Sequence, residues 1–269
     1  MSGFSAEWLA LRESYDLRAR NPIVLDAVAA SFGSRDALSV VDLACGAGST
    51  VRALGPHLPA RQHWDLVDND LRLLAVACSR KLSDDVRLNA VPLDLSSHFA
   101  AALDGTKDLI TISALLDLVS ENWLDRFTRH VASRALPVYA ALTYDGRIDF
   151  SPSDPLDETI TSAVNAHQRT DKGFGPALGP SAAAAAISRF EALGYSVLQG
   201  NSDWVIGIAD QEIQLELLAG WATAASEIEA LPRRDIDNWQ ARRKDAVSAR
   251  TSKMRVGHVD FLATPMAIR

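Results

Sequence analysis

Carboxylates follow three apolar runs of the chain, at Asp42, Asp68 and Asp94. The carboxyl ends of parallel strands lie at one edge of a sheet, and ligands of such sheets bind at that edge. We therefore expect the three side chains to face one site. There they could accept hydrogen bonds from the hydroxyl groups of a sugar, and they would favour a ligand that carries positive charge.

A glycine-rich turn follows the first of these acids, in the segment DLACGAGST of residues 42–50. Glycine lacks a Cβ atom, so the backbone of such a turn can approach a nucleotide closely. A dinucleotide-binding turn reads G-x-G-x-x-G, but Val51 stands at the third glycine position here. The charge of Asp42 would also repel a pyrophosphate. The turn therefore favours a cationic nucleoside and makes a NAD-dependent dehydrogenase a distant alternative.

Together these features resemble the motifs of class I S-adenosylmethionine-dependent methyltransferases, most clearly over residues 38–145. The resemblance implies S-adenosylmethionine as cofactor, with its sulfonium and ammonium groups, and S-adenosylhomocysteine as product. It implies that Asp68 accepts both ribose hydroxyls and that Asn69 flanks the adenine. Asp94 would accept from the adenine amino group beside Leu95. The full set of cofactor-binding residues that it implies is Asp42, Ala44, Gly46, Gly48, Asp68, Asn69, Asp94, Leu95 and Ser113.

Each acid also has a purely structural explanation, because aspartates at strand ends often cap the following helix. This alternative is strongest for Asp94 and weaker for Asp68. A fourth apolar run at residues 107–118 contains Ser113 and falls where the family has its fourth motif, beside the transferred methyl group. The order and spacing of all four segments favour one shared site.

The catalytic candidates are Asp117, Tyr144 and His167, which follow the fourth and fifth strands or lie in the segment beyond them. Histidine is the natural base for a hydroxyl acceptor, because its ordinary pKa is about 6.5. A surface histidine is the alternative for His167. Methyl transfer from a sulfonium needs alignment and exclusion of water more than it needs a fixed set of catalytic side chains. The sequence therefore says less about the methyl acceptor than about the cofactor site.

Composition and charge narrow the classes of partner. The 269 residues are 48% hydrophobic and 23% charged, and the net charge is −7. This balance is typical of a globular protein with a sizeable core and argues against a broad nucleic-acid surface. No Cys or His pair has the spacing of metal ligands, so we expect no metal. The sequence shows no secretory signal and no apolar run long enough to span a bilayer, so we expect a cytoplasmic monomer or homodimer.

Short β-like runs alternate with helical segments from residue 38 to 145, which predicts an α/β fold. We expect a doubly wound, mostly parallel seven-stranded sheet of the Rossmann-like methyltransferase type. Residues 1–37 would form an N-terminal helical cap on a core of residues 38–269. We expect the fifth strand to end at residue 142, with a lid-like insertion over 143–180 and a helical insertion over about 210–252. In the cap, Tyr15 or one of three arginines could meet the methionine carboxylate or the substrate, namely Arg12, Arg18 and Arg20.

The sequence therefore predicts methyl transfer to a small molecule, at oxygen, nitrogen or carbon. The chain lacks the Asn-Pro-Pro-Tyr run that in the family accompanies methylation of planar nitrogens, since Ser113-Ala114-Leu115-Leu116 stands in its place. One alternative is a methyltransferase for RNA or protein that uses the basic segment 233–255. Another is a module that binds S-adenosylmethionine without catalysis.

Overall fold

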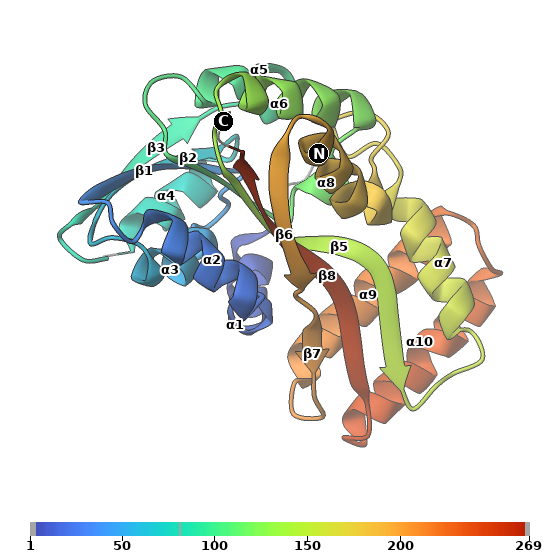
Figure 1. The fold of residues 1–269 in the computed structure, drawn as a ribbon. Coiled ribbons are helices and arrows are strands. Elements are labelled where there is room, and N and C mark those ends of the chain that lie inside the picture. Colours follow the sequence, from blue (N-terminus) through green and yellow to red (C-terminus); the bar gives the residue numbers. More distant parts are fainter. Residues whose placement is uncertain (1–3, 81, 267–269) are drawn as a thin grey trace.

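Five parallel strands form the centre of the sheet in this computed structural model, which describes residues 4–80 and 82–266 (Figure 1). The described part has an eight-stranded sheet of order β3-β2-β1-β4-β5-β8-β6, with β7 paired to β8. The order reverses between β1 and β4, as in other doubly wound sheets. The strands are β1 (Ala37–Leu43), β2 (Arg61–Asp68), β3 (Val86–Pro92), β4 (Leu109–Ser113), β5 (Val138–Ser151), β6 (Tyr195–Asn201), β7 (Trp204–Ile206) and β8 (Lys253–Pro265).

Helices cover both faces of this sheet (Figure 1). They are α1 (Ala6–Ala19), α2 (Pro22–Phe32), α3 (Ser49–Leu54), α4 (Leu71–Ser79), α5 (Leu95–Ala102), α6 (Glu121–Ser133), α7 (Asp157–Gln168), α8 (Ala182–Ala192), α9 (Gln211–Glu227) and α10 (Arg233–Ser248). Short 3-10 turns lie at Gly55–His57, Leu116–Leu118 and Gly179–Ser181. The α/β prediction is confirmed. The short strand β7 makes the sheet one strand larger than the seven that we expected.

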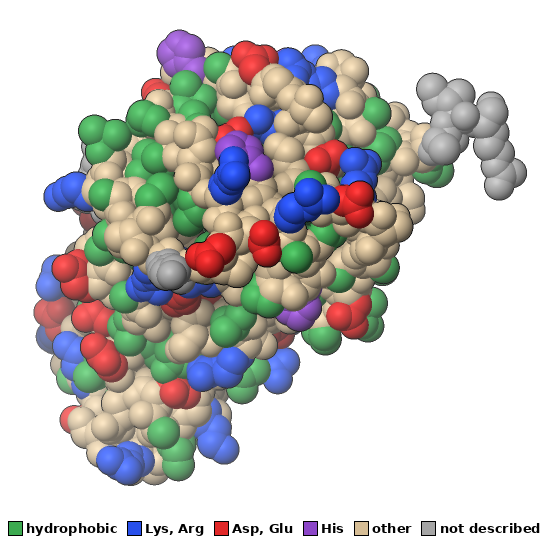
Figure 2. Space-filling view, turned by 90° about the vertical axis from the view of Figure 1, so that its left-hand side faces the viewer, with side chains coloured by type: hydrophobic (Ala, Val, Ile, Leu, Met, Phe, Trp, Pro, Cys, Tyr) green, Lys and Arg blue, Asp and Glu red, His purple; other side chains and the backbone are tan. Residues whose placement is uncertain are grey.

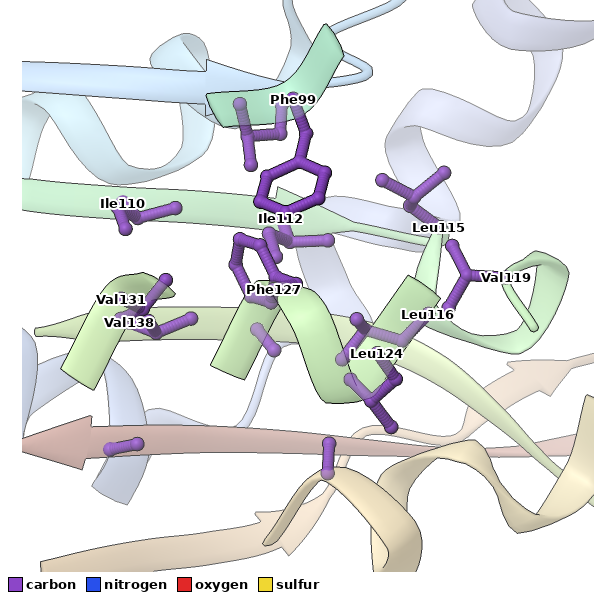
Figure 3. Close-up of a cluster of buried hydrophobic side chains, with 14 of the residues drawn as sticks. Phe99, Ile110, Ile112, Leu115, Leu116, Val119, Leu124, Phe127, Val131 and Val138 are labelled. Atoms are coloured by element: carbon purple, nitrogen blue, oxygen red, sulfur yellow. The ribbon is translucent and has the colours of Figure 1, made fainter. Parts of the chain in front are cut away.

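Alternate residues of the central strands build two cores. In β1, Val41 and Leu43 face α5, α6 and α8, while Val40 faces α2, α3 and α4. This follows from the two-residue period of a strand. Figure 3 shows the first core, in which Phe127 and neighbouring side chains of α6 point toward Ile110 and Ile112 of β4. Full burial of such side chains on both faces fixes the register of the strands and therefore the positions of their carboxyl ends.

The N-terminal segment begins with two well-capped helices. The Ser5 hydroxyl accepts from the backbone N–H of Trp8 at 3.1 Å, and the Asn21 side chain accepts from Ile23 N at 3.1 Å. Pro22 occupies the first turn of α2, and Gly33 follows its last residue. These are the boundaries that the sequence predicts. With these boundaries, α1 lies beside the carboxyl edge of the sheet, where it can contribute to a site.

The expected end of strand β5 at residue 142 was wrong. The strand continues to Ser151, because β8 runs antiparallel beside it from Val138 to Ser151. The register shifts between Ala140 and Thr143, and Leu142 has a φ of 55°. Asp260 of β8 accepts the backbone N–H of Leu142 at 2.7 Å, which satisfies a donor at this irregularity. Propensity in the sequence gives no sign of this long-range pairing.

The extended ends of β5 and β8 carry a third core, which we call the distal lobe and define as α7, β7, α9, α10 and residues 144–151 and 253–258. Its buried side chains include Trp221, Trp239 and Val256. Tyr15 of α1 also belongs to this core, so the lobe is joined to the N-terminal helices. Among residues 4–80 and 82–266, no helix combines the length and the apolar character that crossing a membrane requires.

Candidate active site

A cavity of about 1320 Å³ lies at the carboxyl ends of β1, β2 and β4. One end is built by the glycine turn, the ends of β2 and β3 and the starts of α4 and α5. We call it the cofactor end. Another part of the lining is built by the end of α7, the segment after it and the last residue of α9, and we call it the acceptor end. Predicted site residues in the lining are Ala44, Gly46, Asp68, Asn69, Asp94, Leu95, Ser113 and His167.

The glycine turn is fixed to the end of β2 by Asp68. The Gly46 N–H donates to Oδ2 of Asp68 at 2.9 Å, and the Asp70 N–H donates to Oδ1 at 2.9 Å. Gly46 has a φ of 52°, and a Cβ there would lie 3.2 Å from Cδ1 of Leu9 on α1. The turn therefore needs glycine both for its conformation and for the close packing of α1. Asp68 keeps further lone pairs free to accept from a ligand in the cavity.

Asp94 caps α5 and also lines the cavity. Its carboxylate accepts from the Ser96 N–H at 2.9 Å and from the Ser97 hydroxyl at 3.2 Å. The hydrogen bonds from Ser96 hold the pKa of the Asp94 carboxyl below its ordinary value. The helix-capping explanation therefore describes this residue, and it leaves the predicted contact with an adenine possible because an ionised carboxylate can accept several hydrogen bonds.

Asp42 differs from our expectation, because it lies beneath the cavity and not in its lining. The side chain is buried, and its Oδ1 accepts from the Thr111 hydroxyl at 2.7 Å. Its Oδ2 has no partner among the residues that the structure describes. Burial raises the pKa of Asp42 to about 7. Gly48 also lies outside the lining, where its φ of 79° allows it to begin α3.

A buried polar network lies below the floor of the cavity. Arg20 of the N-terminal segment donates to the Tyr139 hydroxyl at 3.2 Å and to the Ser113 hydroxyl at 3.5 Å. Tyr139 in turn donates to Asp260 at 3.3 Å. Burial is the largest influence on the pKa of the Arg20 guanidinium and lowers it, but the charge of Asp260 and the hydrogen bond to Tyr139 raise it above its ordinary value. Arg20 therefore supplies a cation to a region that contains several buried carboxylates, including Asp42.

Helix α1 forms a charged wall of the cavity with Arg12, Glu13 and Asp16. Arg12 Nε donates to Asp16 at 3.0 Å, and its guanidinium lies 5.0 Å from the ring centre of Trp204. Glu13 pairs with Arg52 of α3. Of the cap residues that we considered, Arg12 lines this cavity and Arg20 lies below it, whereas Tyr15 donates to Asp210 at 2.9 Å. Arg18 lies against the ring of Tyr15.

The three predicted catalytic residues do not come together. His167 lines the acceptor end, whereas Asp117 and Tyr144 lie behind the lining. Burial raises the pKa of Asp117 to about 6, and its Oδ1 has no partner among the described residues. The Tyr144 hydroxyl donates to Asn165 at 2.8 Å, and burial raises its pKa above the ordinary value. Tyr144 is thus engaged with α7, and its phenol does not face the cavity lining.

Comparison with known proteins shows the fold. No protein-family model matches this sequence, and no curated protein matches it. A cyclopropane-fatty-acyl-phospholipid synthase-like protein from Lactobacillus casei superimposes with a TM-score of 0.54 at 12% identity, over 97% of this chain and 94% of that chain. The chain therefore shares the Rossmann-like α/β fold of that protein. The carboxyl edge that holds the cavity is the edge at which doubly wound sheets of this kind bind their ligands.

Two further structures match less closely in shape. The YcgJ protein from Bacillus subtilis has a TM-score of 0.49 at 15% identity, over 92% of this chain and 100% of that chain. A methyltransferase from Thiobacillus denitrificans, in complex with S-adenosylhomocysteine, has a TM-score of 0.46 at 13% identity, over 97% of this chain and 99% of that chain.

Sequence reasoning missed two residues at the acceptor end of the cavity. Lys172 and Glu227 line the cavity beside His167. His167 Nε2 lies 2.8 Å from Oε2 of Glu227, and Nδ1 lies 3.3 Å from Nζ of Lys172. Glu227 is 60 residues away in the chain, so no local pattern links it to the histidine. Ala44 and Ala114 also lie in the lining, both with positive φ, and the sequence predicted a cofactor-binding role for Ala44 but none for Ala114.

Proposed function

We propose that this protein transfers a methyl group from S-adenosylmethionine to a small-molecule acceptor. The observation that carries the proposal is the meeting of Asp68, Asp94 and the glycine turn around one cavity at the carboxyl edge of the sheet. The three features come from three successive strands. The ribose, the adenine and the positively charged part of the cofactor could each find a suitable partner among these three features.

The residues of the cofactor end fit this ligand in chemistry. Asp68 and Asp94 offer carboxylate oxygens to hydroxyl and amino groups, and Leu95 offers an apolar surface between them. Below the turn, Asp42 has an oxygen without a partner among the described residues, and burial holds its pKa near 7. A cation above the turn would favour the ionised form of Asp42. The donor set therefore suits a positively charged nucleoside.

The cavity is large enough for two molecules. Its volume of about 1320 Å³ exceeds the roughly 300–1,000 Å³ of a pocket for one small ligand. Leu115, Leu118 and Phe174 give the part beyond Ser113 an apolar lining. An acceptor could lie there against the reacting end of the cofactor. The apolar side chains would exclude water, which competes with the acceptor for the methyl group.

The reaction needs little from the protein beyond alignment. The cofactor, when bound, supplies a methyl group on a positively charged sulfur, which is already an activated leaving group. The walls made by α1 and by the segment after α7 hold the acceptor in line with it. Holding two reactants in a productive geometry can contribute about 7–11 kcal/mol to lowering the barrier.

The structure favours a small acceptor over RNA. In the basic segment 233–255, Arg242 pairs with Asp154 at 2.6 Å, Arg243 pairs with Asp157, and Arg233 pairs with Asp237 at 2.8 Å. These pairs neutralise much of the positive charge that a phosphate backbone would need. On the face shown in Figure 2, acidic and basic side chains are interspersed.

Titration calorimetry with S-adenosylmethionine and S-adenosylhomocysteine tests the proposal. The unmutated protein should bind both, and Asp68→Ala should bind both more weakly. Release of labelled methyl groups into a pool of metabolites then separates an enzyme from a module that only binds. If the unmutated protein binds neither nucleoside, the proposed function is wrong.

A further inference from the structure

Lys172, His167 and Glu227 form a connected chain of polar groups in the acceptor wall of the cavity. Lys172 and His167 lie on either side of the end of α7, and Glu227 is the last residue of α9. The three residues thus come from two elements that pack together in the distal lobe. Helix α7 is held there by Ile160 and Val164, which are buried against the core of the lobe.

The hydrogen bonds define which nitrogen of His167 carries the proton. A lysine ammonium has donors and no acceptor, so the Nδ1 of His167 must accept from Lys172. In the neutral imidazole the hydrogen then lies on Nε2, from which it is donated to the Glu227 carboxylate at 2.8 Å. Glu227 therefore orients the ring and can stabilise a positive charge on it. The lone pair that could take a proton points toward Lys172.

Lys172 has an unusual environment for a cation. Burial lowers the pKa of its ammonium, while the charges of Glu227 and Asp117 oppose that effect. Among the residues that the structure describes, its side chain has one hydrogen-bond partner, the ring of His167. Asp117 acts from behind the lining, where its own oxygen lacks a partner. An anion placed in the cavity beside Lys172 would compensate for the loss of hydration.

We propose that the acceptor is a hydroxyl compound whose oxygen binds between Nζ of Lys172 and Nδ1 of His167, replacing the direct contact between them. This inference rests on the proposed function and names the class of its acceptor. The hydroxyl proton passes to Nδ1 of His167, and Glu227 stabilises the imidazolium that results. Lys172 stabilises the negative charge on the oxygen. An oxygen lone pair then forms the new bond to the methyl carbon, while the carbon–sulfur bonding pair returns to sulfur.

The roles of the three residues differ. His167 and Lys172 would touch the reacting oxygen, so they are catalytic residues in this proposal. Glu227 touches only His167, so it is a positioning residue. A hydroxyl group that is difficult to ionise in water needs both a base and a cation, and the contact of 3.3 Å provides both at one place. An amine acceptor would have no use for the cation, which would repel a protonated nitrogen.

The test uses 4-nitrophenol, a phenol whose ionised form has a distinct absorption band, added to the complex with S-adenosylhomocysteine. The pH is set about one unit below the pKa of the free probe, so that most of it is neutral in solution. Binding between Lys172 and His167 should raise the ratio of phenolate to phenol about tenfold, which corresponds to one pKa unit of the probe. Lys172→Met and His167→Asn should each remove this increase.

The position of Glu227 gives a second readout. Glu227→Gln should reduce the phenolate ratio, because the ring loses a charged partner, whereas Glu227→Asp should retain part of it. Glu216→Gln, an exposed change on the same helix, is the matched control and should leave the ratio unchanged. Binding of S-adenosylhomocysteine in each variant shows that the protein is folded.

The possible results separate this inference from the proposed function. If S-adenosylhomocysteine binds but the probe binds as neutral phenol or does not bind, the oxyanion site is rejected and the cofactor site stands. An increase in phenolate that survives in both Lys172→Met and His167→Asn also rejects it. If S-adenosylhomocysteine itself does not bind to the unmutated protein, the proposed function fails, and the probe added to the protein alone still reports on the site.

Discussion

The two ends of the cavity are built in different ways. The cofactor end takes its polar groups from residues 44–96, which follow the ends of three successive strands. The acceptor end combines the end of α7, the segment after it and the last residue of α9, and His167 and Glu227 there are 60 residues apart in the chain. The first end depends on local strand–turn–helix geometry. The second depends on how the distal lobe packs against the sheet.

The comparison extends to the chemistry of the walls. At the cofactor end, carboxylates of Asp68 and Asp94 are held by backbone N–H groups, so their positions follow from the sheet. At the acceptor end, Lys172, His167 and Glu227 hold one another through side chains. Side chains held by backbone N–H groups keep their positions when a neighbouring side chain is replaced. In a network of side chains, the loss of one member changes the positions of the others. Substitutions should therefore affect the two ends to different degrees and with little coupling between them.

The largest effect should come from replacing Arg20, because this residue supplies the cation of the buried polar network below the floor of the cavity. Arg20→Met removes the cation near Asp42 and Asp260 and leaves buried carboxylates uncompensated. Removing one partner of a buried charge network costs about 3–5 kcal/mol of unfolding free energy. Urea denaturation at neutral pH measures it. Arg35→Met, which breaks the exposed pair with Asp108, is the control and should cost less than about 1 kcal/mol. Equal losses of unfolding free energy for the two variants would show that the buried network stabilises the protein no more than an exposed ion pair does.

The next largest effect should fall on cofactor affinity. Asp68→Ala removes the acceptor of two backbone N–H groups and the expected acceptor of the ribose hydroxyls, so S-adenosylhomocysteine should bind about 100-fold more weakly. Asp94→Ala leaves the turn intact, and its effect should be about tenfold. Calorimetry measures both, with the exposed Asp149→Ala on β5 as control. If Asp94→Ala has the larger effect, the glycine turn does not depend on Asp68 as the structure indicates.

The same contrast explains what the sequence could predict. The order of strands and helices, the caps at Ser5 and Asn21 and the meeting of Asp68, Asp94 and Ser113 follow from periodicity and turn signals in short segments. The continuation of β5 to Ser151 does not, because it is stabilised by β8, which begins about 100 residues later. Periodicity also places Asp42 at the correct strand end but cannot show that Thr111 encloses it.

Residues at the acceptor end were predicted least well for a related reason. His167 was found because histidine is a candidate base wherever it occurs. Its partners could not be found, because Glu227 approaches it only through the packing of α7 against α9. Asp117 is near in sequence to Ser113 but turns into the core, where burial raises its pKa to about 6. Distance along the chain therefore gave the wrong neighbours for this end of the cavity.

The pH dependence of stability tests the buried carboxyl of Asp42 beneath the cavity. The pKa of Asp42 is about 7 in the folded protein and about 4 in an unfolded chain. Between these values the folded protein holds more protons, so this residue makes the protein less stable as the pH rises from about 4 to about 7. Asp42→Asn removes that contribution. The stability of the variant relative to the unmutated protein should therefore increase by about 2–4 kcal/mol across this window.

Denaturation curves at several pH values measure this difference, and the other raised carboxyls, Asp117 and Asp260, cancel because both proteins contain them. Asp149→Asn, at an exposed position, should give a curve parallel to that of the unmutated protein. A constant difference between Asp42→Asn and the unmutated protein would mean that Asp42 is ionised throughout the window. The cation in the region would then be sufficient to keep it charged.

The smallest effect on cofactor affinity should come from Lys172→Met, and a small effect is what independent ends of the cavity predict. Lys172 contacts His167 and faces Glu227 and Asp117, none of which belongs to the expected cofactor contacts. S-adenosylhomocysteine should therefore bind to this variant within about twofold of the unmutated protein, since distant sites without shared partners act almost independently. Calorimetry beside Lys244→Met, an exposed change on α10, measures it. A loss comparable to that of Asp68→Ala would mean that the acceptor wall also holds the cofactor, and the cavity would then have to be described as one site with two coupled ends.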